Sequence, residues 1–85
     1  MHGGASGRAA ARHTHAAQTH DAAAELHERA ANLQEAHAAE MRDAGASDWA
    51  ARAEALADRE RELAQAERIK ARTERAHAAR MRSGS

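Results

Sequence analysis

The chain has 85 residues, enough for at most one small domain. Its thirteen basic and thirteen acidic side chains cancel, so net charge gives no reason for it to bind nucleic acid or an anionic membrane surface. Cysteine is absent, which excludes disulfides and thiolate metal sites. No apolar run approaches the ~20 residues of a membrane span, and the opening "MHGGASGRAA" lacks the apolar core of a secretory signal, so we expect a cytoplasmic protein.

The composition predicts long helices. Alanine, glutamate, arginine, glutamine and leucine are strong helix formers, and the chain contains no proline. Residues 1–7 are rich in glycine and serine, so we expect a flexible N-terminus there. Nothing interrupts a helix over about 8–44, after which Gly45 can take the left-handed conformation that ends a helix.

A second helix follows a turn at 45–47. Ser47 or Asp48 can cap a helix over about 48–82, and the tail 83–85 should be flexible. A short loop makes neighbouring helices antiparallel. The sequence therefore predicts an all-α antiparallel hairpin over 8–82, made of two long alanine-rich helices.

The few bulky apolar residues indicate where helices meet. Trp49, Leu56 and Leu63 are spaced by seven, as in the seam of a coiled coil, and Leu26 and Leu33 lie on one face of the first helix. We expect these side chains to be hidden between the two helices. A lone hairpin would cover them on one side only, so we also expect a homodimer that forms a four-helix bundle, with these five residues as its interface.

Charge is distributed unevenly along the chain. Residues 21–43 carry six acidic and two basic side chains, and residues 68–82 carry six basic and one acidic. Segments of opposite charge suit an antiparallel partner or each other. Three glutamates spaced by seven lie on the leucine side of the second helix, which suggests carboxylates that pair with a partner's arginines. They are Glu60, Glu67 and Glu74.

Seven histidines are the chemically distinctive feature. His13, His20 and His27 are spaced by seven, about 10.5 Å apart along a helix, which is too far for one metal ion and typical of a solvated polar face. A fold at the turn would bring residue i near residue 93 − i, which places His15 beside His77. Glu74 and His77 are one helical turn apart, a spacing that metal-binding bundles use. His15, Glu74 and His77 are therefore the candidate ligands of a zinc, copper or nickel ion.

The histidines also predict a response to pH. Seven groups with an ordinary pKa near ~6.5 would raise the net charge towards +7 at about pH 5. We expect His37, on the apolar face of the first helix, to be partly buried and neutral. Self-repulsion and the charging of this group should lower stability between about pH 7 and pH 5.

No residue pattern indicates catalysis. The hydroxyl residues lack a convincing histidine and aspartate partner, and a two-helix hairpin offers no concave pocket unless it oligomerises. The basic segment 68–82 contains no aromatic residue to stack on bases, so a nucleic-acid partner is not expected. The sequence predicts a small non-enzymatic interaction or scaffold protein that self-associates or binds a protein partner. The alternatives are histidine-mediated transition-metal binding and a pH-responsive helical module.

Overall fold

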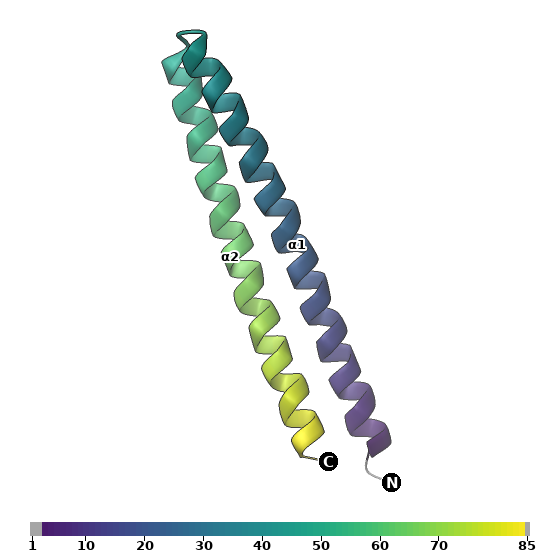
Figure 1. The fold of residues 1–85 in the computed structure, drawn as a ribbon. Helices are drawn as coiled ribbons and strands as arrows, with labels where there is room; N and C mark the ends of the chain where they lie inside the picture. Colours follow the sequence, from purple (N-terminus) through teal and green to yellow (C-terminus); the bar gives the residue numbers. More distant parts are fainter. Residues whose placement is uncertain (1–2, 85) are drawn as a thin grey trace.

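The computed structural model describes residues 3–84 as two helices that lie side by side in a hairpin (Figure 1). Helix α1 spans Gly3–Asp43 and helix α2 spans Ser47–Ser83. The molecule measures 67 × 12 × 11 Å, so it is a rod two helices wide. The prediction of an all-helical hairpin is confirmed. Helix α1 begins earlier than the expected start near residue 8, and the first two residues and the last lie outside the described part of the chain.

The turn ends α1 through its backbone. Gly45 has a φ of 78°, the left-handed conformation that glycine adopts without strain. The amide of Ala46 donates to the carbonyl of Met41 at 2.8 Å, and the amide of Gly45 donates to that of Arg42 at 3.0 Å. These two bonds form a Schellman motif, which satisfies carbonyls at the helix end. The N-cap of α2 is Ala46, and no side chain caps it, so the expected capping by Ser47 or Asp48 is wrong.

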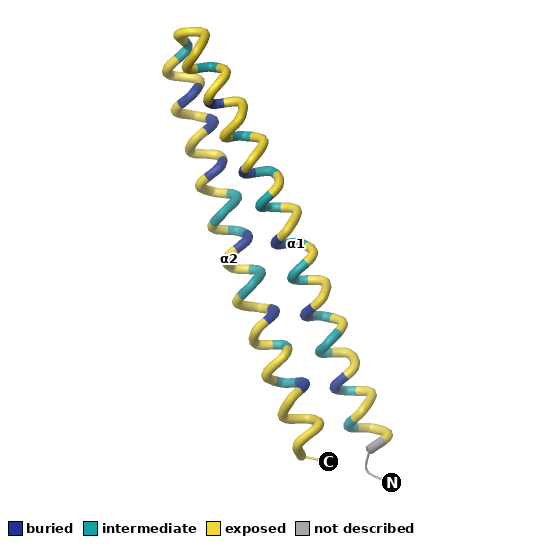
Figure 2. Tube along the Cα trace, viewed as in Figure 1, coloured by how far each residue is buried: buried dark blue, intermediate teal, exposed yellow. Residues whose placement is uncertain are grey.

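Alanine forms the whole interior between the helices. Every buried side chain among the described residues is alanine, and Figure 2 shows these positions along the facing sides of both helices. They recur mostly every seven residues, the period at which one side of a helix stays turned towards a partner. We call this set the alanine seam. It comprises Ala10, Ala17, Ala24, Ala31 and Ala38 in α1, and Ala50, Ala53, Ala57, Ala64, Ala71 and Ala78 in α2.

The bulky apolar residues lie outside this seam, so the expectation that they are hidden between the two helices is wrong. Leu33 is 72% exposed, Trp49 59% and Leu56 53%. Trp49 and Leu56 each precede a seam alanine by one residue, which turns them about 100° away from the neighbouring helix. Methyl groups let helices approach towards the lower end of the ~8–10 Å range, where no room remains for a leucine.

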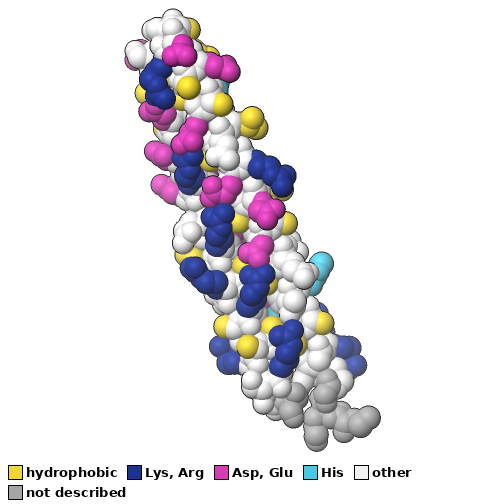
Figure 3. Space-filling view, in the orientation of Figure 1, with side chains coloured by type: hydrophobic (Ala, Val, Ile, Leu, Met, Phe, Trp, Pro, Cys, Tyr) yellow, Lys and Arg dark blue, Asp and Glu magenta, His cyan; other side chains and the backbone are white. Residues whose placement is uncertain are grey.

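Neither helix could cross a membrane. Within the described residues, no stretch of either helix is both long enough and apolar enough to span a bilayer. Charged and polar side chains recur in every turn or two along both helices, as the space-filling view also shows (Figure 3).

The seam predicts that enlarging a buried alanine destabilises the hairpin. Ala64 is fully buried, and Ala64→Leu should cost about 1–3 kcal/mol because the added atoms force the helices apart. Thermal unfolding followed by circular dichroism should show a melting temperature lower by about 4–8 °C per kcal/mol. Ala66 is exposed on the same helix, so Ala66→Leu should change stability by less than about 0.5 kcal/mol. Equal effects from the two variants would contradict this packing.

Candidate functional site

Three histidines of α1 contact three glutamates of α2 along one side of the alanine seam. The distance from histidine Nδ1 to glutamate Oε2 is 2.5 Å in the first pair and 2.6 Å in the other two. The residue numbers of each pair add up to 87, because both sets repeat every seven residues along antiparallel helices. We call this set the His–Glu ladder. Its pairs are His13–Glu74, His20–Glu67 and His27–Glu60.

The ladder has the electrostatics of a charge-assisted contact. Each imidazole Nδ1–H donates to a carboxylate oxygen, and all six side chains are partly shielded, with exposed fractions between 20% and 32%. The hydrogen bond from His20 lowers the pKa of Glu67 below its ordinary value, and the bond from His13 does the same for the pKa of Glu74. Both carboxylates are therefore held in their charged form.

A second set of polar contacts runs along the other side of the seam. It joins acidic residues of α1 to arginines of α2, with one reversed pair nearest the turn, and acidic and basic groups alternate along this face in Figure 3. The residue numbers of each pair add up to 96. We call this set the arginine ladder. Its ion pairs are Asp21–Arg75 at 2.5 Å, Glu28–Arg68 at 3.0 Å, Glu35–Arg61 at 2.5 Å and Arg42–Glu54.

The arginine ladder shows how the charged segments meet. Asp21 and Glu28 belong to the acidic segment and contact arginines of the basic segment, so the two segments pair within one chain. The hydrogen bond from Arg75 lowers the pKa of Asp21. Arg82 continues the same line, because its Nη2 donates to Thr14 Oγ1 at 3.0 Å. Because most of these groups are well exposed, water and salt screen each ion pair and it contributes little to stability.

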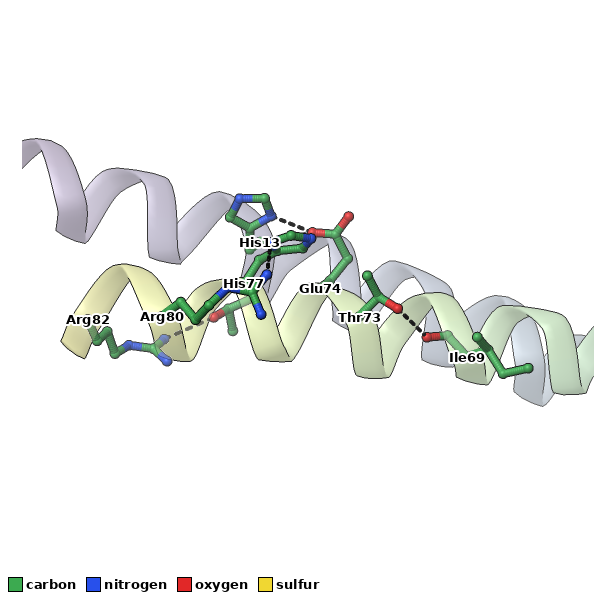
Figure 4. Close-up of polar contacts among 8 residues, drawn as sticks. His13, Ile69, Thr73, Glu74, His77, Arg80 and Arg82 are labelled. Atoms are coloured by element: carbon green, nitrogen blue, oxygen red, sulfur yellow. Dashed lines mark hydrogen bonds and ion pairs between the residues drawn. The ribbon is translucent and has the colours of Figure 1, made fainter. Parts of the chain in front are cut away.

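The candidate metal ligands His15, Glu74 and His77 do not form a three-ligand group. Glu74 accepts a hydrogen bond from His13, and the rings of His13 and His77 stack with their centroids 5.2 Å apart (Figure 4). His77 Nδ1 accepts from Arg80 Nη2 at 2.6 Å. His15 is exposed. Among residues 3–84, no group of three or more His, Asp, Glu or Cys side chains could hold a metal ion.

The side of α1 on which each histidine lies explains why His13, rather than His15, contacts Glu74. On this side of the seam residue i of α1 contacts residue 87 − i of α2, and on the other side it contacts residue 96 − i, so the expected 93 − i gives the height along the rod but not the side of the helix. His13 and His15 are two residues apart, so they project about 200° apart around the helix and cannot both reach α2. The side chain of His13 follows a seam alanine by three residues, which directs it to the edge of the seam.

A groove opens where the His–Glu ladder stops. The next position of the ladder pairs Gln34 with Ala53, whose numbers also add up to 87, and the small alanine leaves a hollow of about 330 Å³. Trp49 and Leu56 line this groove from α2, and His37 lines it from α1. His37 is exposed, so its expected partial burial is wrong. The guanidinium carbon of Arg52, which also lines the groove, lies 4.9 Å from the Trp49 ring centre.

Sequence reasoning noted both halves of the His–Glu ladder but did not join them. The available signal was their shared period together with their shared offset, since each of the six ladder residues lies three residues after a seam alanine. Comparisons with protein families, curated proteins and solved structures gave no significant match to this chain. Function is therefore inferred from the contacts of the chain itself.

The ladder predicts an acid limit to stability. Because the folded chain lowers the pKa of Glu67 and Glu74 below the ordinary 4.5, their stabilisation is present above that value and is lost as pH falls through the lower folded pKa. Chemical unfolding of the wild type should give a free energy that declines below about pH 4.5. Glu67→Gln should make that decline shallower.

The control is Glu40→Gln, which removes an exposed carboxylate on α1. This variant should keep the steep acid decline of the wild type. Identical acid profiles for the Glu67 variant and the wild type would show that the ladder does not stabilise the fold.

Proposed function

We propose that this protein is a small non-enzymatic helical interaction module that self-associates through an apolar surface near its turn. Trp49, Leu56 and Leu63 line one side of α2, and Leu26 and Leu33 project from α1 at similar distances from the turn. We call these five residues the apolar patch. They are the residues that the sequence proposes as an interface.

The observation that supports this proposal most directly is that small apolar side chains fill the interior while large ones lie on the surface. The interior is built of alanine, while four of the patch residues are more than half exposed. Fully burying a leucine-sized side chain is worth about 1.5–3 kcal/mol, which is more than an alanine methyl supplies. In a small chain with a weak core, covering this patch contributes more stabilising free energy than any single contact inside the hairpin.

Polar side chains in the hairpin support a structural role. The hydroxyls of Thr19 and Thr73 each donate to a carbonyl one turn earlier in their own helix, at 3.1 Å. The histidines of the His–Glu ladder are held by carboxylates across the seam, where they join the helices. The two hydroxyls are thus satisfied within their own helices, and the ladder histidines hold the two helices together.

A second candidate, a pH-responsive module, is favoured by the His–Glu ladder. Protonation of a ladder histidine creates an ion pair with a carboxylate that is already in contact. The loss of stability is then expected once the carboxylates themselves take up protons, rather than when the histidines charge. This places the response at lower pH than the histidine content alone suggests.

Histidine-mediated binding of zinc, copper or nickel is the weaker alternative. Carboxylate-bonded histidines resemble those that ligate metals through the other ring nitrogen. The ladder histidines are seven residues apart, about 10.5 Å, so each could offer only one ligand to an ion. A stable site would therefore need ligands from beyond one hairpin.

Removing the apolar patch should abolish self-association. In the double variant Leu33→Ser, Leu56→Ser, sedimentation over a range of concentrations should show a monomer, with the dissociation constant raised at least about a hundredfold, or ~2.7 kcal/mol. Ile69 is 49% exposed and lies about 140° around α2 from Leu56, so Ile69→Ser is the matched control and should remain dimeric. A wild type that stays monomeric at every concentration would overturn the proposal.

A further inference from the structure

Apolar and polar residues divide one side of the hairpin along its length. This side, which we call the ladder face, carries the His–Glu ladder and the groove. One line of residues on α2, spaced by seven, starts at the turn with Trp49 and Leu56 and continues past Leu63 as Lys70 and His77. This line is therefore apolar in the half near the turn and polar in the half near the open end.

The bulky apolar residues of the two helices lie at the same height along the long axis of the hairpin. Contacts between the helices join residue i to residue 87 − i on one side of the seam and to 96 − i on the other. Leu33 is thus level with residues 54–63, which include Leu56, and Leu26 is level with residues 61–70, which include Leu63. The groove lies at this height too, because Ala53 and Leu56 line it.

From this arrangement we propose that a second copy of the chain covers the ladder face, with both turns at the same end and a twofold axis parallel to the rods. The proposal rests on the proposed self-association and specifies its geometry. The twofold axis places α1 of one copy against α2 of its partner at equal height. Leu33 then packs beside the partner's Leu56, and the same contact recurs across the axis.

In a reversed dimer the turn of one copy would lie beside the open end of its partner. If the two copies overlapped over their full length, this arrangement would bury charged groups under apolar side chains. It would set Trp49 and Leu56 against the open half of the partner, where Lys70, Glu74 and His77 lie. Charged groups covered by apolar side chains lose hydration without gaining partners. The parallel arrangement instead brings patch against patch and His–Glu ladder against His–Glu ladder.

Net charge alone would favour the reversed arrangement. Residues 26–63 hold nine acidic and five basic side chains, a net charge of −4, and the rest of the chain carries the opposite +4. In the turn half, however, the arginine-ladder pairs are neutral, and the acidic Asp58 and Glu62 lie on the arginine-ladder side of α2, about 100° and 160° around the helix from the seam. Salt screens charges over about 8 Å, so the apolar contacts decide the orientation.

The absence of cysteine from the chain allows a direct test by spin labelling. Ser47→Cys puts one label at the turn and Ser83→Cys puts one near the open end, and both positions are exposed. Pulsed electron–electron double resonance on a dimer with one label in each chain measures the distance between the two equivalent sites. Both distances should fall below about 35 Å, because a bundle is only two helix diameters of ~10 Å across.

Other distances would overturn the arrangement. A full-length reversed dimer places the two turn labels roughly a molecular length apart, and that length is 67 Å. A reversed dimer overlapping only at the patches separates the open-end labels by more than this length. A sample that sedimentation shows to be monomeric overturns the proposed function itself, so the two failures are distinguishable.

Sodium chloride gives an independent second measurement. In the parallel dimer the turn halves, which carry like charge, face each other and repel. Because salt screens this repulsion, raising sodium chloride from 0.05 to 0.5 M should lower the dissociation constant of the dimer by about threefold to tenfold. The reversed dimer, held by opposite charges, should weaken over the same range. Ile69→Ser, which lies off the ladder face, should show the same salt response as the wild type.

Discussion

The hairpin depends on how closely two helices can approach when only methyl groups separate them. Every buried position among the described residues is alanine, and the seam runs from Ala10 and Ala78 near the open end to Ala38 and Ala50 near the turn. Dispersion contacts between backbones and methyl groups are individually small but accumulate along a rod 67 Å long. The same closeness excludes larger side chains from the seam.

Excluding bulky residues shapes the rest of the molecule. Polar groups at both edges of the seam are brought within hydrogen-bond reach, which creates the His–Glu ladder on one side and the arginine ladder on the other. The two ladders fix the register, because a shift by one residue would break every pair in both. Leucine and tryptophan remain outside, where they form an apolar surface that the hairpin itself does not cover.

The sequence predicted the two helices, their turn and their antiparallel packing, because helix propensity and Gly45 act locally. The expectation that leucine and tryptophan side chains lie between the helices was wrong. Leu56 and Leu63 have the spacing of a seam, and hydrophobicity favours them over alanine, but Ala57 and Ala64 repeat with the same period one residue later. Only the distance between the helices decides between the two sets, and that distance is a property of the assembled pair.

The His–Glu ladder was hidden for a related reason. Its pairs depend on which side chains reach the edge of the seam: His13 does so beside Glu74, whereas His15, at a similar height, projects about 200° away around the helix. Joining the two periodic sets required the seam to be known first. Once Ala71 is placed on the seam, Glu74 at its edge follows from helix geometry.

The most direct test of the close-packed hairpin is a distance within one chain. Spin labels on cysteines replacing Gln18 and Arg72, both exposed, should lie within about 30 Å in a sample diluted with unlabelled protein, because the helix axes are only ~8–10 Å apart. A single narrow distribution in that range is the expected result. A separation near 80 Å, as in one continuous helix at ~1.5 Å per residue, or a broad distribution, would contradict the account.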